Sequence, residues 1–431
     1  MSKLVGTAGV SVLGDKSLEF YRDPVAFCQQ RIEKHGTRIF QSRLLNKPTS
    51  FVCSVEGMKE LLCEKSSVFL KDPTDVMHNM YGDNIVTANG ELMSQRSIGC
   101  NLHGCEYFLK ALYFHVCSVH FSDYHFLCSG EPVSVYPLFK RLGTELVLGL
   151  FLNVNPDETP ELFQDITALC TLHWHGIIST PVSVKVPLWS SGFCTALEAK
   201  DKLMDIIKDK LEFVGYLRDL PLPDASCASQ HLLLFISALI PKALASLLTS
   251  FTLVLSGAGK KEIRNHARAD PDYLYYVLLE IQRLWPPFIG GRRIANQDTT
   301  LGGFHIPKGY AAMYISHAIH RDPEVFHQPE DFLPERWGGR NAGQEHLLCS
   351  LGNGPRNCIG VQLNNVFLKA ACGYLLQHYD WDLSPYSQDL QYKWLPVSRP
   401  TVPPMFYFCF IRPEDISPKS TIFVPMCSCK P

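Results

Sequence analysis

The spacing of hydrophobic residues divides the chain into a mixed segment, a long helical segment and a second mixed segment. Residues 17–70 combine a helical stretch, PVAFCQQRIEKHG, with two short β-type runs, TRIFQSRLL and TSFVCSV. Residues 89–283 have a mostly helical pattern. After residue 286, PPFIGG, TTLGGFHIPKGY and AAMYISH are typical of strands joined by glycine and proline turns, and a last helix is predicted over residues 361–379. The pattern predicts a mainly α protein with a small β part.

The most apolar stretch, residues 231–257, is long enough to span a membrane. It carries Pro241 and Lys242 near its centre, and a charge at that depth costs at least ~2.5 kcal/mol on insertion scales. We therefore expect a helix buried in the core of a large domain rather than a membrane span.

Composition and charge exclude several classes of protein. The 431 residues are 46% hydrophobic and 19% charged, with a formal net charge of −2, so nucleic acid is not an expected partner. The 16 cysteines include no Cys-x-x-Cys pair, which favours reduced thiols over a zinc site or a disulfide framework. The N-terminal sequence has the pattern of neither a signal peptide nor an anchor. We expect an intracellular protein, soluble or peripherally bound to a membrane, or a chain that lacks its true start.

The helix expected within residues 272–287 carries two opposite charges on one face. Pro286 and Pro287 would end this helix. Glu280 and Arg283 are three residues apart, so their side chains can pair. Taken alone, such a pair is more often an exposed ion pair worth under ~1 kcal/mol than part of a functional site.

The stretch SLGNGPRNCIG, residues 350–360, surrounds one cysteine with unusual neighbours. Gly352 and Gly354 allow the backbone to turn sharply and to approach a flat ligand. Cys358 then precedes a new helical pattern, where amide donors and the helix dipole would stabilise a thiolate. A buried structural cysteine is the alternative. A phosphate loop is disfavoured because no lysine follows the glycines and no Gly-x-Gly-x-x-Gly pattern forms.

These two stretches, with DFLPERW (331–337) between them, resemble in order and spacing the cytochrome P-450 superfamily of haem-thiolate enzymes. The resemblance covers roughly residues 17–410 and is strongest over 271–378. It implies the superfamily's mainly α fold with a small β part, as a single domain over residues 1–431. The segment LGGFHIPKG is similar to the branch that includes retinoic-acid and sterol hydroxylases, which hints at lipid substrates.

The resemblance also assigns roles to residues of this chain. Cys358 matches the axial ligand of the haem iron, and a thiolate in that position favours O–O cleavage. Glu280 and Arg283 match the family's Glu-x-x-Arg pair, and Arg336 matches the arginine that completes their buried network.

Three arginines match positions that contact the haem propionates, where cations offset the burial of carboxylates. They are Arg356 in the cysteine stretch, Arg293 in GRRIANQD and Arg96 in GELMSQR. For Arg96 and Arg293, a solvated arginine is the alternative. The glycines expected beside the cofactor are Gly352, Gly354 and Gly360.

The sequence departs from the family pattern at several positions. Leu351 stands where the family usually has an aromatic residue, and Leu92 replaces a tryptophan often found four residues before the early arginine. Residues 98–128 and the tail after Arg412 match poorly. Those two regions are either divergent or errors in a predicted gene.

The largest departure lies in the apolar helix. Aligning ALASLLTSF with the family's oxygen-binding helix places Lys242 and Ala243 where an acid and a threonine normally pass protons to oxygen. Ser246, one turn further on, is a candidate to donate through water. Pro241 is expected to kink this helix.

Lys242 allows two interpretations. A cation beside the iron would bind a fatty-acid carboxylate, similar in kind to the peroxygenase branch, which uses an Arg-Pro pair in this helix. The alternative, which we favour slightly, is a lysine that points away between helices, with its stem packed and its ammonium at the surface.

The resemblance implies three candidate functions. The first is a monooxygenase that inserts one oxygen atom from O2 into an apolar, lipid-like molecule, with haem b as cofactor and electrons from NADPH through a reductase. The second, favoured by Lys242 and Ala243, is a lipid-hydroperoxide isomerase, a dehydratase or a peroxygenase, which needs neither O2 nor a reductase. The third is an inactive haem-binding relic.

Overall fold

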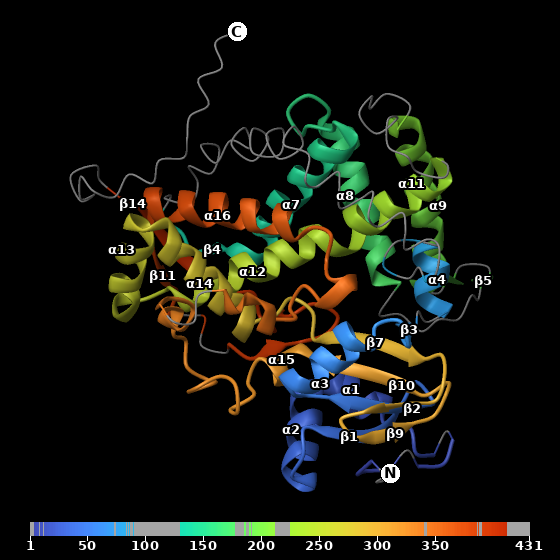
Figure 1. The fold of residues 1–431 in the computed structure, drawn as a ribbon. Helices are drawn as coiled ribbons and strands as arrows, with labels where there is room; N and C mark the ends of the chain where they lie inside the picture. The colour runs from blue at the N-terminus through green and yellow to red at the C-terminus, as the bar shows by residue number, and fades with distance from the viewer. Residues whose placement is uncertain are drawn as a thin grey trace.

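Figure 1 shows the fold in a computed structural model, with most helices gathered in one part and the largest sheet in another. The structure describes most of residues 4–411. Residues 1–3, 90–129, 177–184, 212–224 and 412–431 lie outside the described part, as do several shorter stretches.

The main helices follow the predicted pattern, and their ends have clear local causes. Asp23 caps α2 by accepting from the amides of Val25 and Ala26, and Gly36 ends this helix with a positive φ of 61°. The helices of six or more residues are α1 (Ser17–Arg22), α2 (Pro24–His35), α4 (Asp75–Tyr81), α7 (Val135–Leu152), α8 (Pro160–His175), α9 (Gly192–Leu211), α11 (Ala225–Leu234), α12 (Ile240–Val254), α13 (Lys261–Ala269), α14 (Pro271–Leu284) and α16 (Val361–His378).

Shorter helical turns connect these elements. They are α3 (Val55–Lys59), α15 (Ser316–Ile319), the π-helical turns η1 (Glu60–Glu64) and η4 (Phe235–Leu239), and the 3-10 turns η5 (Ala258–Lys260), η6 (Pro334–Trp337), η8 (Gln344–Leu347) and η9 (Gly354–Arg356).

The largest sheet joins the two mixed segments of the sequence. Its strand order is β1-β2-β10-β7-β3, in which β10 pairs parallel to β2 and antiparallel to β7. The strands are β1 (Ile39–Leu44), β2 (Lys47–Val52), β3 (Phe69–Lys71), β7 (Gly290–Ala295) and β10 (Ala311–Ile315).

The remaining strands form small separate sheets. The predicted TTLGGFHI hairpin is confirmed, because β8 (Thr299–Leu301) pairs with β9 (Phe304–Ile306) around two glycines of positive φ. The others are β11 (Tyr379–Leu383), β14 (Met405–Phe410) and β4 (Val133–Ser134) in one sheet, β12 (Tyr392–Lys393) with β13 (Arg399–Pro400), and β5 (Lys185–Val186) with β6 (Trp189–Ser190).

The long apolar stretch lies in the core, as expected. Within Ala228–Val254, which is long and apolar enough to cross a membrane, 78% of the most apolar window is buried inside the protein. A π-helical turn, η4, ends just before Pro241, whose ring and missing N–H do not fit a regular helix interior. A Cβ on Gly143 of α7 would lie 2.9 Å from the Cα of Pro241, so α7 and α12 meet here at close range.

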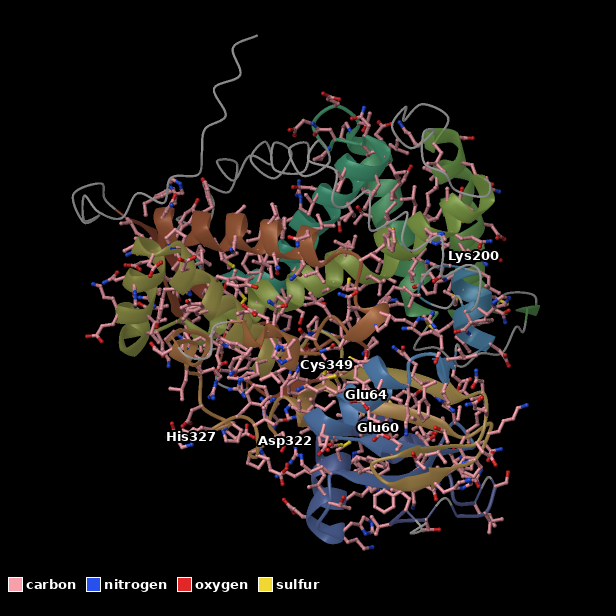
Figure 2. The ribbon with its side chains drawn as sticks, viewed as in Figure 1. Glu60, Glu64, Lys200, Asp322, His327 and Cys349 are labelled. Atoms are coloured by element: carbon pink, nitrogen blue, oxygen red, sulfur yellow. The ribbon has the colours of Figure 1, made fainter. Side chains whose placement is uncertain are left out.

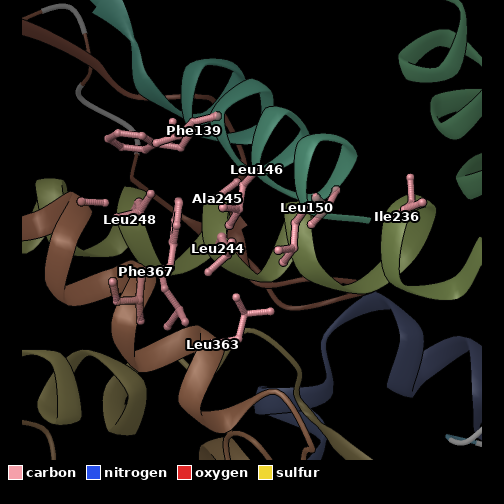
Figure 3. Close-up of a cluster of buried hydrophobic side chains, with 14 of the residues drawn as sticks. Phe139, Leu146, Leu150, Ile236, Leu244, Ala245, Leu248, Leu363 and Phe367 are labelled. Carbon is pink, nitrogen blue, oxygen red and sulfur yellow. The ribbon is translucent and has the colours of Figure 1, made fainter. Parts of the chain in front are cut away.

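Helices α7 and α16 pack against α12 in one part of this core. Figure 3 shows Phe139, Leu146 and Leu150 of α7 facing Leu244, Ala245 and Leu248 of α12, with Leu363 and Phe367 of α16 below them. Leucine and phenylalanine side chains of this kind contribute roughly 1.5–3 kcal/mol each when fully buried. This packing holds the N-terminal end of α16, which follows the cysteine loop, against α12.

Candidate functional site

The loop that carries Cys358 is a tight turn that glycines make possible. Gly352 and Gly354 have φ values of 78° and 67°, a region that other residues rarely adopt. A Cβ on Gly354 would lie 2.2 Å from the carbonyl oxygen of Leu62 in η1, so this position excludes any side chain. The loop is closed by the amide of Cys358, which donates to the carbonyl of Leu351 at 2.7 Å.

Cys358 presents an exposed thiol just before α16. The amide of Gly360 donates to its Sγ at 3.3 Å. An N–H aimed at sulfur favours the thiolate, which is the form that binds metals. The alternative of a buried structural cysteine is therefore wrong for this residue.

Asn353 anchors the loop, although the sequence analysis did not identify it. Its Oδ1 accepts from the amide of Gly354 at 2.7 Å and from the thiol of Cys63 at 3.4 Å. Its Nδ2 donates to the carbonyl of His346 at 2.6 Å and to that of Leu348 at 3.1 Å. An asparagine between two glycines is a common turn signal, and it is the one clue that the sequence offered.

Glu280 and Arg283 pair in the protein interior. Arg283 donates from Nε to Glu280 Oε2 at 2.9 Å and from Nη2 to Oε1 at 2.7 Å, and both side chains have an exposed fraction of 0%. The alternative of an exposed ion pair is therefore wrong. Arg336 joins them, since its Nε donates to Glu280 Oε1 at 3.1 Å.

The rest of this network comes from groups that the sequence analysis did not identify. Trp337 Nε1 donates to Glu280 Oε2 at 2.9 Å, and the amide of Leu333 donates to Oε1 at 3.0 Å. Arg283 uses its remaining N–H groups on three backbone carbonyls, those of His320 at 2.8 Å, Pro329 at 2.6 Å and Asp331 at 3.0 Å. All five N–H donors of a guanidinium are thus engaged.

Arg356 lies in the cysteine loop, within η9, and Arg293 lies on β7 of the large sheet. Arg293 has an exposed fraction of 3%, and burial lowers the pKa of its guanidinium. It donates to the carbonyl of Arg292 at 2.9 Å and packs on the ring of Tyr314, but it forms no ion pair with a carboxylate among the residues that the structure describes. Arg356 Nη1 donates to Asn89 Oδ1 at 2.9 Å. Arg96 and Leu92 lie outside the described residues, as do residues 98–128 and the tail after Arg412.

These features fit a haem. The buried guanidinium of Arg293, which has no carboxylate partner within the described part of the chain, suits a propionate, since buried charges are normally paired. Cys358 supplies an accessible sulfur with an amide donor, and the positive φ values of Gly352 and Gly354 keep side chains away from the turn. Gly360 contributes through its backbone amide, which donates to the sulfur of Cys358 at 3.3 Å.

The side chain of Lys242 lies between α12 and α8, which agrees with the slightly favoured interpretation of a lysine packed between helices. Its ammonium donates to the carbonyl of Ser237 and lies 4.4 Å from the ring centroid of Trp174 on α8. Its exposed fraction is 4%, so the expectation that the ammonium reaches the surface is wrong. Burial lowers the pKa of this amine to about 7, with a smaller opposing effect from Cys170.

Ala243 and Ser246, about one turn apart on α12, differ in burial, since Ala243 keeps partial exposure and Ser246 does not. Between Ile236 and Thr252, the residues that keep partial exposure are Leu239, Ile240 and Ala243, which share one face of the helix. Ser246 is fully buried, and its hydroxyl lies 3.0 Å from that of Ser398.

The direction of the Ser246 hydrogen bond follows from its partner. Ser398 donates its own proton to the carbonyl of Pro286 at 2.8 Å, so Ser246 must donate to Ser398. Of Lys242, Ala243 and Ser246, only Ala243 keeps partial exposure, so it alone lies on the accessible face of α12.

The fold and the Cys358 loop together define the haem-thiolate class of proteins. The family model described as Cytochrome P-450 matches residues 241–408, which contain Glu280, Arg283, Arg336 and Cys358 in the predicted order. This part of the chain, residues 241–408, belongs to the cytochrome P-450 family.

Similar proteins are found in several groups of organisms. The chain is 28% identical over 298 residues to "Putative cytochrome P-450 120" of Synechocystis sp., covering 62% of this chain and 65% of that protein. It is 40% identical over 114 residues to cytochrome P-450 3A1 of Rattus norvegicus, covering 26% of this chain and 22% of that protein. These alignments span less than two thirds of either relative. With beta-amyrin 28-monooxygenase of Kalopanax septemlobus, identity is 23%, and coverage is 88% of this chain and 86% of that protein.

Solved structures show the same fold. The retinoic-acid-bound cyanobacterial CYP120A1 matches with a TM-score of 0.82 at 22% identity, covering 95% of this chain and 99% of that one. A myristic-acid-bound cytochrome P-450EX alpha matches with a TM-score of 0.74 at 14% identity, covering 95% and 100%. The mainly α fold with a small β part is thereby confirmed.

Proposed function

We propose that the protein is a haem-thiolate monooxygenase that inserts one oxygen atom from O2 into an apolar, lipid-like small molecule. The observation that carries the proposal is the exposed thiol of Cys358, which accepts a hydrogen bond from the amide of Gly360 at 3.3 Å, in a chain that also holds the buried Glu280–Arg283 pair. Relatives named as beta-amyrin monooxygenases support the type of reaction. Electrons would come from NADPH through a reductase as partner.

The haem would be held by residues from three elements. Cys358 would bind the iron, and Arg293 and Arg356 would pair with the propionates, joined by Arg96 if it reaches them. When bound, the haem supplies the oxygen chemistry, and its thiolate ligand favours O–O cleavage. The amide of Gly360 stabilises negative charge on the sulfur of Cys358, and this hydrogen bond is in place before any substrate binds.

The opposite wall of the site would be the accessible face of α12. Leu239, Ile240 and Ala243 present only hydrocarbon there, which excludes water and favours an apolar substrate. The partial burial of these side chains, within a helix that is otherwise buried, supports this assignment.

A second candidate function is the rearrangement or use of lipid hydroperoxides without O2 or a reductase. The observation that favours it is the absence of a proton donor from the accessible face of α12 within residues 236–252. Ala243 has no hydroxyl, Lys242 is held by Ser237 and Trp174, and Ser246 donates to Ser398. A carboxylate anchor at Lys242 is disfavoured by the same contacts. An inactive haem-binding relic is the third candidate.

The test uses the purified haem protein and a panel of fatty-acid hydroperoxides, with neither NADPH nor reductase present. No loss of hydroperoxide, in protein whose ferrous-CO complex has the thiolate spectrum, supports the monooxygenase. Loss that disappears in Cys358→Ala selects the second candidate. Absence of the thiolate spectrum in the wild type refutes both and leaves the relic.

A further inference from the structure

His320 forms hydrogen bonds with both nitrogens of its ring deep inside the protein. It follows α15 directly and has an exposed fraction of 0%. Its Nδ1 lies 2.9 Å from the carbonyl oxygen of Arg283, and its Nε2 lies 2.9 Å from the amide nitrogen of Cys349 and 3.5 Å from the sulfur of that residue. Figure 2 labels Cys349 at the junction between the large sheet and the helices.

The partners determine the tautomer of this ring. A carbonyl oxygen accepts only, so Nδ1 carries the proton that bonds Arg283. A backbone amide donates only, so Nε2 is the unprotonated nitrogen that accepts from Cys349. His320 is therefore a neutral connector with both nitrogens in use, and burial, which lowers its pKa to about 3, agrees with this state.

The two partners belong to the two parts of the proposed haem site. On one side, Arg283 pairs with Glu280 and also donates to the carbonyl of His320 itself at 2.8 Å. On the other side, Cys349 begins the turn that carries Cys358, since its carbonyl accepts from the amide of Gly352 at 3.0 Å. The ring of His320 thus connects the buried ion pair to the first residue of the cysteine turn.

We propose that His320 is a positioning residue that fixes the cysteine turn, and with it the sulfur of Cys358, through the Cys349 amide. The inference rests on the proposed function, in which Cys358 is the haem ligand. Without the Nε2 acceptor, a buried N–H would lose its partner, and the turn would move to recover one. A displaced sulfur would hold the iron less firmly as a thiolate.

Two substitutions separate the two hydrogen bonds of the ring. In His320→Gln the terminal amide lies near the place of Nε2, so its oxygen can still accept from Cys349. In His320→Asn the shorter amide lies near the place of Nδ1, so it can donate to Arg283 but does not reach Cys349. Cys349→Ala is the matched control, because it removes the sulfur and keeps the backbone N–H.

The measurement is the rate at which the ferrous-CO complex of each haem-loaded variant loses its thiolate spectrum in mild denaturant. We expect His320→Asn to lose it about tenfold faster than wild type, the change that losing one buried hydrogen-bond partner can produce. His320→Gln and Cys349→Ala should stay within about threefold of wild type.

Haem uptake by the glutamine variant but not by the asparagine variant would support the same conclusion. Equal behaviour of both His320 variants, including failure of both to take up haem, would overturn it. A wild-type protein without the thiolate spectrum would refute the proposed function as well, which distinguishes that failure from this one.

Discussion

The buried ammonium of Lys242 makes a specific prediction about stability and pH. Burial lowers the pKa of this group from 10.5 to about 7, although the Ser237 carbonyl and the Trp174 ring both favour the cation. A difference of roughly 3.5 pKa units corresponds to about 5 kcal/mol between the folded and unfolded chains. Lys242→Met keeps the length of the side chain and removes its charge, so we expect it to raise the free energy of unfolding by about 3–5 kcal/mol at low pH.

The sign of the pH dependence follows from the lowered pKa. Below about pH 7 the folded and unfolded chains both hold the proton, and the wild type bears the full unfavourable free energy of a buried cation. Between about pH 7 and 10.5 the unfolded chain binds a proton that the folded chain has released, so the stability of the wild type rises with pH. The advantage of Lys242→Met should therefore fall towards zero near pH 10.

Urea unfolding of both proteins at about pH 6, 8 and 10 measures this difference. Subtracting the two curves removes the contribution of other titrating groups, provided that they respond equally in both proteins. Lys202→Met, at an exposed position of α9, is the control and should change stability by less than about 0.5 kcal/mol at each pH. A methionine variant that is less stable than wild type at pH 6, or an advantage that does not vary with pH, would refute the reasoning.

Three further predictions concern the buried network and the cysteine loop. Arg283→Lys should lower the free energy of unfolding by about 3–5 kcal/mol, because the guanidinium donates five hydrogen bonds and an ammonium can donate only three. Wild-type stability of this variant in urea denaturation would contradict this. Trp337→Phe should lower it by about 1.5–3 kcal/mol by removing one hydrogen bond to the carboxylate of Glu280, and an unchanged melting curve would argue against that bond. Gly354→Ala should displace the turn from Leu62 and reduce haem content in a titration; full haem occupancy with the wild-type spectrum would count against the close packing.

The helical spacing of Glu280 and Arg283 predicted that they pair, whereas the burial of the pair was predicted only by the family resemblance. A spacing of three residues brings two side chains together on any helix, whether the helix is exposed or buried. Burial depends on Trp337 and on backbone groups of residues 320–333, which reach Glu280 or Arg283 only after the chain has folded. Likewise, the glycines around Cys358 predicted a turn, whereas its connection to η1 through Asn353 joins segments 290 residues apart.

Helix α12 shows why the position of a residue in the sequence did not predict the direction of its side chain. Lys242 and Ala243 are neighbours in the chain, yet about 100° separates successive side chains around an α-helix. The π-helical turn at Phe235–Leu239 changes the phase of the helix just before these residues, and Pro241 was its only signal in the sequence. Lys242, which the sequence alignment placed at the position of the family's acid, is therefore not on the accessible face of α12.

The side chains on the accessible face of α12 decide how the two candidate functions can be distinguished, because they determine whether the helix can supply protons. Leu239, Ile240 and Ala243 offer no proton on the accessible face, so a monooxygenase would have to take its protons from water or from the substrate. Ala243→Thr places a hydroxyl on that face without disturbing Lys242 or Ser246. If the protein is a monooxygenase limited by proton delivery, this variant should form more product per NADPH consumed, by up to about tenfold, and its solvent isotope effect should change. If it acts on hydroperoxides, the added hydroxyl should leave turnover unchanged or lower it, and an increase in hydroperoxide turnover would contradict the role assigned to this face.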